Sequence, residues 1–295
     1  MSEKLLVTGA SGKLGRLVLD ALLKRGVPAS NIIGTTRDAT KLADYAAKGI
    51  AVREADFNDP ASVKKAFTGA DRVAIISTDA IDGNGTRIRQ QTGAVAAAKE
   101  AGVKHIVYTS MPNPREGSKI TFEADHRLTE EAVKASGLAY TILRNAWYQE
   151  NLFMNLPQVL ASGTWYTSAG QGKVSHIARQ DCADALAAVL ASDRVESKVY
   201  TLTGPEGLTT DEIAKFASDA TGKPIAVVHL TDEQLAGGMN AAGVPDYLVP
   251  FMVGFDANTR EGGADMVTSD VELLTGRKPR SLQAFLQENK ALLAG

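Results

Sequence analysis

The 295-residue sequence contains little of what several classes of protein require. Its single cysteine, Cys182, cannot form a disulfide within the chain, and its four histidines are scattered, so we expect no metal site. No apolar run approaches the roughly 20 residues that a membrane-spanning helix needs. These absences argue against a disulfide scaffold, a metalloprotein and a helical membrane protein.

Charge of one sign is also lacking. Lysine and arginine number 32 against 34 aspartate and glutamate, a formal net charge of −2, and neither sign is clustered. We therefore expect no nucleic-acid partner. Met1 leads directly into an apolar run that begins at Lys4, so we expect no signal peptide. These features predict a cytoplasmic protein with a small-molecule partner, and exposed helix faces are compatible with a homodimer.

The first half of the chain alternates short β-rich runs with helical patterns of about 10–15 residues. Strands are expected at 4–7, 32–36, 50–55, 72–76, 105–109 and 139–143. Such alternation is typical of right-handed βαβ units. It predicts an α/β fold with a doubly wound parallel sheet of the Rossmann type.

Glycines mark the ends of the expected helices. Each of five stands after a helical pattern and before a strand, where a helix C-cap belongs. These are Gly26, Gly49, Gly69, Gly102 and Gly137.

The rhythm loosens after Arg144. We expect helices at 149–160, 183–191 (capped by Asp181), 209–220, 232–242, 245–255 and 281–293, and strands within 164–177 and at 199–202 and 226–230. The expected organisation is a dinucleotide-binding core at 1–147, to which 174–203 returns, and a smaller α/β C-terminal lobe for substrate at 148–295.

The most informative stretch follows the first strand. Gly9, Gly12 and Gly15 open a helix whose apolar residues recur at helical spacing. Such a turn aims backbone N–H groups and the positive end of a helix dipole at one point, which suits a phosphate. Gly9 allows the tight turn, Gly12 the approach of a pyrophosphate, and Gly15 close packing. The expected cofactor-binding segment is Gly9, Ala10, Ser11, Gly12, Lys13, Leu14 and Gly15.

Ligands of open α/β sheets bind at the carboxyl ends of the strands, so the residues after each strand are the next candidates. Arg37 could meet a 2′-phosphate with a forked contact, which favours NADPH, whereas the neighbouring Asp38 keeps NADH as the alternative. Asp56 could accept a hydrogen bond from the adenine amino group, with Phe57 beside the ring. Further cofactor-binding candidates after later strands are Ser77, Thr78, Ser110 and Asn145.

Several of these segments together resemble the NmrA-like, atypical short-chain dehydrogenase/reductases, and within them the NAD(P)H:quinone oxidoreductases and triphenylmethane reductases. The segments are Thr-Gly-Ala-Ser-Gly-Lys-Leu-Gly at 8–15, Arg37, Asp56-Phe57, the run at 101–110, Leu-Arg-Asn-Ala-Trp-Tyr at 143–148, Ala-Gly-Val-Pro at 242–245 and Ser269-Asp270. The similarity covers nearly the whole chain. It implies an oxidoreductase that transfers hydride from NAD(P)H to a quinone or similar electrophilic acceptor without a flavin.

One departure from the wider superfamily bears on mechanism. The Tyr-x-x-x-Lys pair that supplies a catalytic acid is missing, because Phe-Glu-Ala-Asp-His stands at 122–126. Protonation of a strongly basic alkoxide would be slow without such an acid. A quinone instead yields a phenolate-like anion stabilised by its own ring, so binding and orientation can do most of the work.

His126 is the candidate proton donor, because an unperturbed histidine titrates near pKa 6.5. Tyr148 is the second catalytic candidate, and Trp147 and Phe251 are candidates for contact with a planar substrate. Each also has an ordinary structural interpretation, as a half-buried histidine or as core aromatics. The physiological acceptor, the strict cofactor preference, the proton donor and the oligomeric state do not follow from the sequence.

Two other functions remain open. A non-catalytic NADP(H)-sensing regulator would keep the glycine turn and Arg37 but would need no substrate site. A reductase of carbon–carbon double bonds or imines is compatible with the same fold. Turnover of reduced cofactor with a panel of acceptors discriminates between them.

Overall fold

The computed structural model describes residues 3–193 and 195–293. The chain divides into two compact units. The first takes the described residues up to Met111, Ala124–Arg144 and the described part of Cys182–Tyr200. The second takes Pro112–Glu123, Asn145–Asp181 and the described residues from Thr201 onward. The chain therefore leaves the first unit after residue 111 and returns at 124. It leaves again after residue 144, where the sequence analysis had placed a boundary at 147, and returns at 182–200.

A seven-stranded sheet in the order β3-β2-β1-β4-β5-β6-β8 organises the first unit within the described residues. The registered pairs from β3 to β6 are parallel. Leu6 lies opposite both Ile33 and Val73, and all three are buried, as expected for strands covered on both faces. The strands are β1 (Leu5–Val7), β2 (Ile32–Thr36), β3 (Ala51–Glu54), β4 (Arg72–Ile75), β5 (His105–Ser110), β6 (Ala139–Asn145) and β8 (Lys198–Leu202).

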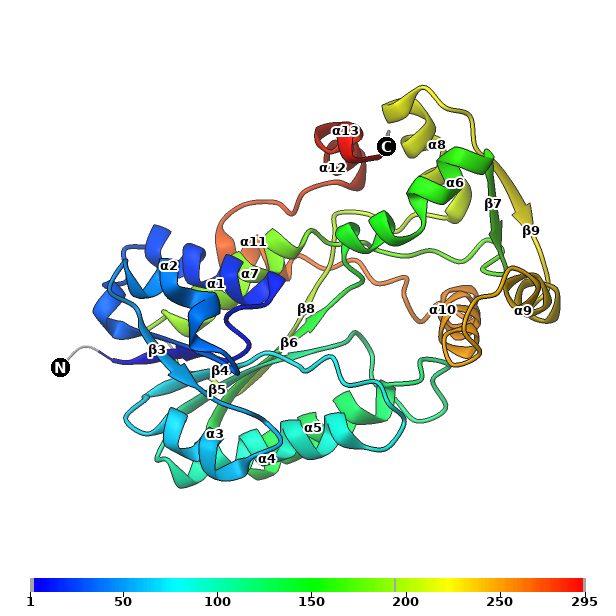
Figure 1. Ribbon diagram of the computed structural model, residues 1–295. Helices are drawn as coiled ribbons and strands as arrows, with labels where there is room; N and C mark the ends of the chain where they lie inside the picture. Colours follow the sequence, from blue (N-terminus) through cyan, green and yellow to red (C-terminus); the bar gives the residue numbers. More distant parts are fainter. Residues whose placement is uncertain (1–2, 194, 294–295) are drawn as a thin grey trace. The chain divides into compact units, whose positions relative to one another are not determined.

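Helices cover both faces of this sheet (Figure 1). One face carries α1 (Lys13–Lys24), α2 (Ala43–Ala46) and α7 (Arg179–Leu190), and the other carries α3 (Pro60–Phe67), α4 (Thr86–Glu100) and α5 (Glu123–Ala135). Short 3₁₀ turns η1 (Ala29–Asn31) and η2 (Ala39–Leu42) flank β2. The largest side chains in the core under α3 and α4 include Phe67 and Tyr108, which are both fully buried.

The structure confirms the expected Rossmann class. Every strand expected in the first half is present within one or two residues of its expected bounds. The five glycines expected at helix ends all have positive φ, between 76° and 92°, a backbone conformation that favours glycine.

The second unit contains a small parallel sheet of β7 (Thr164–Thr167) and β9 (Ala226–His229). A core of Leu156, Ile213, Phe285 and Leu286 joins α6 (Leu156–Ser162), α8 (Thr210–Thr221) and α12 (Leu282–Glu288). The remaining elements are η3 (Gln149–Met154), α9 (Asp232–Ala241), α10 (Val249–Arg260), α11 (Asp270–Thr275) and α13 (Lys290–Leu293). The expected α/β character of the C-terminal lobe is confirmed.

Prolines explain two wrong helix boundaries in this unit. The single helix expected at 149–160 is η3 followed by α6, and Pro157 lies in the first turn of α6. The helix expected at 245–255 is α10, which starts at Val249 with Pro250 in its first turn. Proline lacks an N–H group, and the first turn of a helix does not need one, so each proline favours a new start.

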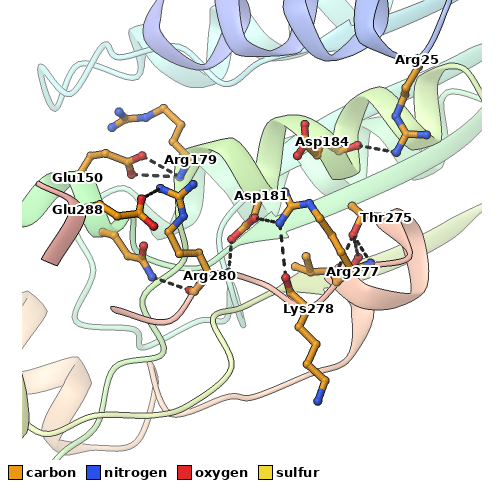
Figure 2. Close-up of polar contacts among 12 residues, drawn as sticks. Arg25, Glu150, Arg179, Asp181, Asp184, Thr275, Arg277, Lys278, Arg280 and Glu288 are labelled. Atoms are coloured by element: carbon orange, nitrogen blue, oxygen red, sulfur yellow. Dashed lines mark hydrogen bonds and ion pairs between the residues drawn. The ribbon is translucent and has the colours of Figure 1, made fainter. Parts of the chain in front are cut away.

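Asp181 does not cap α7, as the sequence analysis expected. The helix begins at Arg179, so Asp181 lies inside its first turn. Its buried carboxylate forms an ion pair with Arg277 at 2.6 Å and accepts the backbone N–H of Arg280 at 2.8 Å (Figure 2). Asp181 therefore anchors the chain between α11 and α12, a long-range contact that local spacing cannot reveal.

Candidate functional site

A cavity of about 320 Å³ lies in the first unit at the carboxyl ends of β1 to β4. It brings together most of the residues that the sequence singled out for a cofactor. These are Gly9, Ser11, Gly12, Lys13, Leu14, Gly15, Arg37, Asp56, Phe57, Ser77 and Thr78.

The glycine turn, residues 9–15, forms one wall of the cavity. Gly9 has φ +57° and its carbonyl accepts the N–H of Gly12 at 2.9 Å, which closes the turn. Gly12 is the N-cap of α1, without a side-chain capping bond. A Cβ on Gly15 would lie 2.3 Å from the Gly9 oxygen and 2.6 Å from the Ala10 Cα. The helix can therefore approach the strand only with glycine at 15, and its N-terminus faces the cavity.

The segment after β4 is held by side chains from two other elements. The N–H of Ser77 donates to Thr109 Oγ1 at 2.9 Å, and the N–H of Thr78 donates to Gln91 Oε1 at 3.2 Å. These bonds fix the backbone of two expected cofactor-binding residues against β5 and α4.

Arg37 and Asp38 occupy different positions relative to the cavity. The exposed Arg37 lines it, whereas Asp38 does not. The Asp38 carboxylate accepts the hydroxyl of Thr40 at 2.5 Å and its N–H at 3.0 Å. These two bonds, the hydroxyl first, lower the pKa of Asp38. The acidic neighbour is therefore committed to a local turn.

Three of the expected cofactor residues lie outside the cavity lining. Ala10 is fully buried beneath the turn. Ser110 is 5% exposed and donates its hydroxyl to Glu130 Oε1 at 2.8 Å, and Glu130 also accepts two bonds from Arg144 at 2.7 and 2.8 Å. Burial raises the pKa of Glu130, but the bonds from Arg144 and Ser110 outweigh it and hold the pKa below its usual value. Asn145 belongs to the second unit.

His126 is only 3% exposed, and both ring nitrogens have partners. Arg87 Nη2 lies 3.0 Å from Nε2, and the Tyr108 hydroxyl lies 2.9 Å from Nδ1. A guanidinium only donates, so we assign the proton to Nδ1, which donates to Tyr108. Burial, and then the charge of Arg87, lowers the pKa of His126 well below 6.5. The expected titration near neutrality is therefore wrong for this ring, and its catalytic role stays a prediction.

A group of half-buried aromatic side chains lies in the second unit. The ring centroid of Trp147 lies 4.6 Å from that of Phe255 and 6.1 Å from that of Phe251. The ring centroids of Phe122 and Phe251 are 5.9 Å apart. We call these four residues the aromatic group. Both Phe251 and Phe255 lie on α10, one turn apart, which brings them to the same side of the helix.

Tyr148 has polar and cationic neighbours within the second unit. Its hydroxyl accepts a hydrogen bond from Asn145 Nδ2 at 3.0 Å, and the Arg179 guanidinium lies 4.8 Å from the ring centre. The carboxylate of Glu150 accepts the backbone N–H of Arg179, with both oxygens at 3.1 Å (Figure 2). These contacts fix the ring that the sequence proposed as catalytic.

The cavity lining also includes seven residues that were not among the expected ones, namely Thr35, Thr36, Ala55, Asn58, Ile76, Asp79 and Gln90. Gln90 lies within α4, where nothing in the local sequence distinguishes it from a solvated glutamine. Its hydrogen-bond partner Asn58 belongs to a different segment, so the sequence around Gln90 does not indicate its place in the cavity lining.

With this geometry established, comparison with known proteins places the chain. It belongs to the NmrA-like family, whose sequence profile matches residues 1–282. It is 35% identical over 257 residues to quinone oxidoreductase 2 of Escherichia coli (strain K12), covering 87% of this chain and 88% of the relative. This membership confirms the resemblance seen in the segments at 8–15 and 143–148.

Comparison with solved structures also finds oxidoreductases complexed with NADPH or NADP(H). The NADPH-dependent quinone oxidoreductase of Escherichia coli complexed with NADPH superposes with a TM-score of 0.90 at 33% identity, over 96% of this chain and 99% of that one. The triphenylmethane reductase of Citrobacter sp. complexed with NADP(H) superposes with a TM-score of 0.88 at 34% identity, over 97% and 100%. Within the described residues, no helix has the length and apolar character needed to cross a bilayer.

Proposed function

We propose that the chain is an NAD(P)H-dependent oxidoreductase that transfers hydride to a quinone or a similar conjugated acceptor without a flavin. The observation that carries this proposal is the glycine turn, where a helix N-terminus opens onto a cavity and where Gly15 leaves no room for a Cβ. Backbone N–H groups in that arrangement suit a pyrophosphate. Two proteins with this fold, 33% and 34% identical to this chain, have been crystallised with NADPH or NADP(H).

NADPH is the proposed cofactor and NADH the weaker alternative. Arg37 lines the cavity after β2 and offers a planar, permanently charged group to a 2′-phosphate. Asp38, the carboxylate that could instead take a ribose hydroxyl, is held by Thr40 and lies outside the lining. The other proposed cofactor contacts are the residues of the glycine turn and Asp56, Phe57, Ser77 and Thr78. Ser110 and Asn145 are candidates that lie outside the cavity lining.

The aromatic group supplies the proposed acceptor contacts. Trp147 and Phe251 are half-buried, so they present ring surface to a flat ligand as well as to each other. Tyr148 is the proposed polar contact, because Asn145 and Arg179 fix its ring. A planar conjugated acceptor is the class of substrate that such a surface favours.

When bound, the reduced nicotinamide supplies the hydride. The chain's own residues hold and orient the reactants, and they offer no strong acid at the positions of the superfamily's Tyr-x-x-x-Lys pair. Burial lowers the pKa of His126 well below its usual value. We therefore propose that this ring contributes through its contacts with Tyr108 and Arg87 and not as a strong acid. A quinone or a cationic dye tolerates this, because its reduced form needs little help from an enzymic acid.

An enzyme is preferred over a regulator that only senses NADP(H). Two relatives that align over 87% and 97% of this chain are named as enzymes, quinone oxidoreductase 2 of Escherichia coli and the triphenylmethane reductase of Citrobacter sp.. The aromatic group also gives the chain a surface that a sensor of the cofactor ratio would not require.

The test is consumption of NADPH, followed by its absorbance, with a panel of quinones, cationic dyes and aldehydes. We expect turnover with quinones and dyes, and slow or absent turnover with aldehydes. Tight NADPH binding without turnover of any acceptor would contradict the enzyme and favour the regulator.

A further inference from the structure

A glycine lies among the aromatic residues of α10. Gly254 stands one helical turn after Phe251 and directly before Phe255, the two residues that this helix contributes to the aromatic group. A Cβ on Gly254 would lie 2.4 Å from the backbone oxygen of Lys119 and 3.5 Å from its carbonyl carbon. Real Cβ atoms essentially never approach another atom within 3.0 Å. The backbone at Lys119 can therefore contact α10 only because position 254 has no side chain.

The segment that makes this backbone contact also contributes a ring to the aromatic group. It connects β5 to α5, and we call residues 112–122 the β5–α5 connection. Phe122, three residues after Lys119, places its ring centroid 5.9 Å from that of Phe251. The connection thus meets α10 twice, once through a carbonyl group and once through a ring. How closely the backbone approaches the helix at Gly254 therefore affects how closely the two rings approach each other.

The helix α10 is held by bonds that do not involve the β5–α5 connection. Asp256 accepts the hydroxyl of Thr167 at 2.8 Å and the backbone N–H of Ser168 at 2.7 Å. Arg260 donates to both carboxylate oxygens of Asp232, at 2.9 and 2.8 Å. These bonds join α10 to the end of β7 and to the start of α9.

The β5–α5 connection is held less firmly than the helix. Residues 112–120 form neither helix nor strand, and none of residues 112–119 is buried. A side chain added at 254 should therefore displace the connection and leave the helix where it is. To restore an ordinary contact of 3.4 Å, the Lys119 oxygen has to move by about 1 Å. A gap of that size removes roughly a quarter to a half of the dispersion energy between contacting atoms.

We propose that Gly254 is a specificity-determining residue for the acceptor, because its lack of a side chain lets the connection hold Phe122 at a distance that suits a thin, flat molecule. The inference rests on the proposed function, in that the aromatic group is taken as the acceptor surface. Trp147, Phe251 and Phe255 form the fixed part of this surface, since they lie on α10 or pack against it. Phe122 is the part whose position depends on residue 254. A larger residue there shifts the preference from flat quinones to bulkier acceptors.

Steady-state kinetics of Gly254→Ala with two acceptors tests the inference. A naphthoquinone is thin and flat, whereas a cationic triarylmethane dye is bulky because its aryl rings are twisted out of one plane. We expect KM for the naphthoquinone to rise about fivefold with kcat within about twofold, the effect of weakening one aromatic contact. KM for the dye should rise by no more than about twofold, because displacement of Phe122 gives it room. The dissociation constant of NADPH should not change, since the cavity lies in the first unit.

Two further variants assign the effect to Phe122. Phe122→Leu removes the ring without adding bulk at 254, and it should raise KM for the naphthoquinone by a similar factor. The double variant Gly254→Ala/Phe122→Leu should exceed either single variant by less than about twofold, because both changes act through the same ring. Gly238→Ala, in α9, is the matched control. No atom lies within 4 Å of its added Cβ, so it should leave both KM values unchanged.

An unchanged KM for the naphthoquinone in Gly254→Ala, or an equal rise for both acceptors, would overturn the inference and leave the proposed function intact. If Gly254→Ala does not fold, an unchanged KM in Phe122→Leu overturns the inference by itself. Additive effects in the double variant would also overturn it. The unmodified chain reports on the proposed function separately, because failure to turn over either acceptor would overturn that function together with the inference.

Discussion

The glycine turn of the first unit and the aromatic group of the second unit, the two surfaces that we propose bind ligands, are built in different ways. The glycine turn is backbone: a Cβ on Gly15 would meet main-chain atoms at 2.3 and 2.6 Å, so side-chain bulk has no place there. The aromatic group is side chain: Trp147 and Phe251 are half-buried and touch through their rings.

This difference determines how each surface responds to substitution. A backbone site binds the part of a ligand that does not change, such as a pyrophosphate, and tolerates almost no substitution. A side-chain site on a helix such as α10 can alter its ligand by exchanging one ring for another. We therefore expect substitutions in the turn to remove binding altogether, and substitutions in the aromatic group to change the acceptor.

The largest effect is expected for Gly15→Ala. The added methyl group must displace the backbone of Gly9 or Ala10, which should lower the free energy of unfolding by about 3 kcal/mol. NADPH affinity should fall by about 100-fold, since the turn and the helix start move together. Urea unfolding and fluorescence titration measure both.

Gly93→Ala is the control for that change. Gly93 lies in the middle of α4, and no atom lies within 4 Å of its added Cβ. We expect it to raise the free energy of unfolding by roughly 0.5–1 kcal/mol, because alanine is the better helix former. Similar losses in both variants would show that the glycine turn is not special.

Trp147→Ala tests the aromatic group and should lower activity with the acceptor. Loss of the ring that packs 4.6 Å from Phe255 removes most of the flat surface, so kcat/KM for a quinone should fall about 30-fold. The dissociation constant of NADPH should change less than about twofold. Steady-state kinetics and cofactor titration separate the two effects.

Tyr166→Ala is the matched control, because this aromatic residue of β7 is 57% exposed and lies outside the aromatic group. It should leave kcat/KM unchanged. A loss of NADPH affinity in Trp147→Ala as large as the loss of kcat/KM would argue that the ring serves the fold and not the acceptor.

Arg37→Ala tests a side chain inside the backbone-dominated site. Without the guanidinium the preference for NADPH over NADH should fall about tenfold, the effect of one lost charge-assisted contact. Arg89→Ala, an exposed arginine outside the lining, should preserve the preference. An unchanged ratio of the two affinities in Arg37→Ala would remove this residue from cofactor selection.

The smallest effect is expected in the pH dependence of stability that one histidine of the second unit contributes. His176, in the second unit, is 5% exposed, and burial lowers its pKa to about 4. Its folded form stays neutral while the unfolded form protonates below pH 6.5, so stability is present above the unfolded pKa and is lost as pH falls toward the folded one. At pH 6 this loss is about 1 kcal/mol relative to pH 7.5.

His176→Asn should remove that part of the pH dependence measured by urea unfolding at the two pH values. His229→Asn, at an exposed histidine paired with Asp211, should keep it. If the pH dependence is the same in His176→Asn as in the unmodified chain, the acid-labile group lies elsewhere.

Much of the first unit could be predicted from the sequence, because its determinants are local. Strand, glycine turn and helix start are contiguous, and most residues that followed a strand line the cavity. His126, Ser110 and Gln90 could not be placed, since their environments come from Arg87, Glu130 and Asn58, far along the chain. Burial of His126 then changed the pKa on which its expected role depended.

The second unit was less predictable for the same reason. Its helix starts depend on prolines whose effect was underrated, and Asp181 is engaged by Arg277 and the backbone of Arg280, almost 100 residues away in sequence. Trp147 and Phe251 were identified as candidates, but only the structure brings both into one group with Phe122 and Phe255.

Deuterium transfer tests the central claim most directly. The chain is supplied with NADPH deuterated at the transferring position of the nicotinamide, and with a cationic triarylmethane dye whose central carbon accepts the hydride. The account predicts that the reduced dye carries the deuterium on that carbon, because the transfer is direct. A reduced dye without deuterium, or NADPH that binds without being consumed, would contradict it.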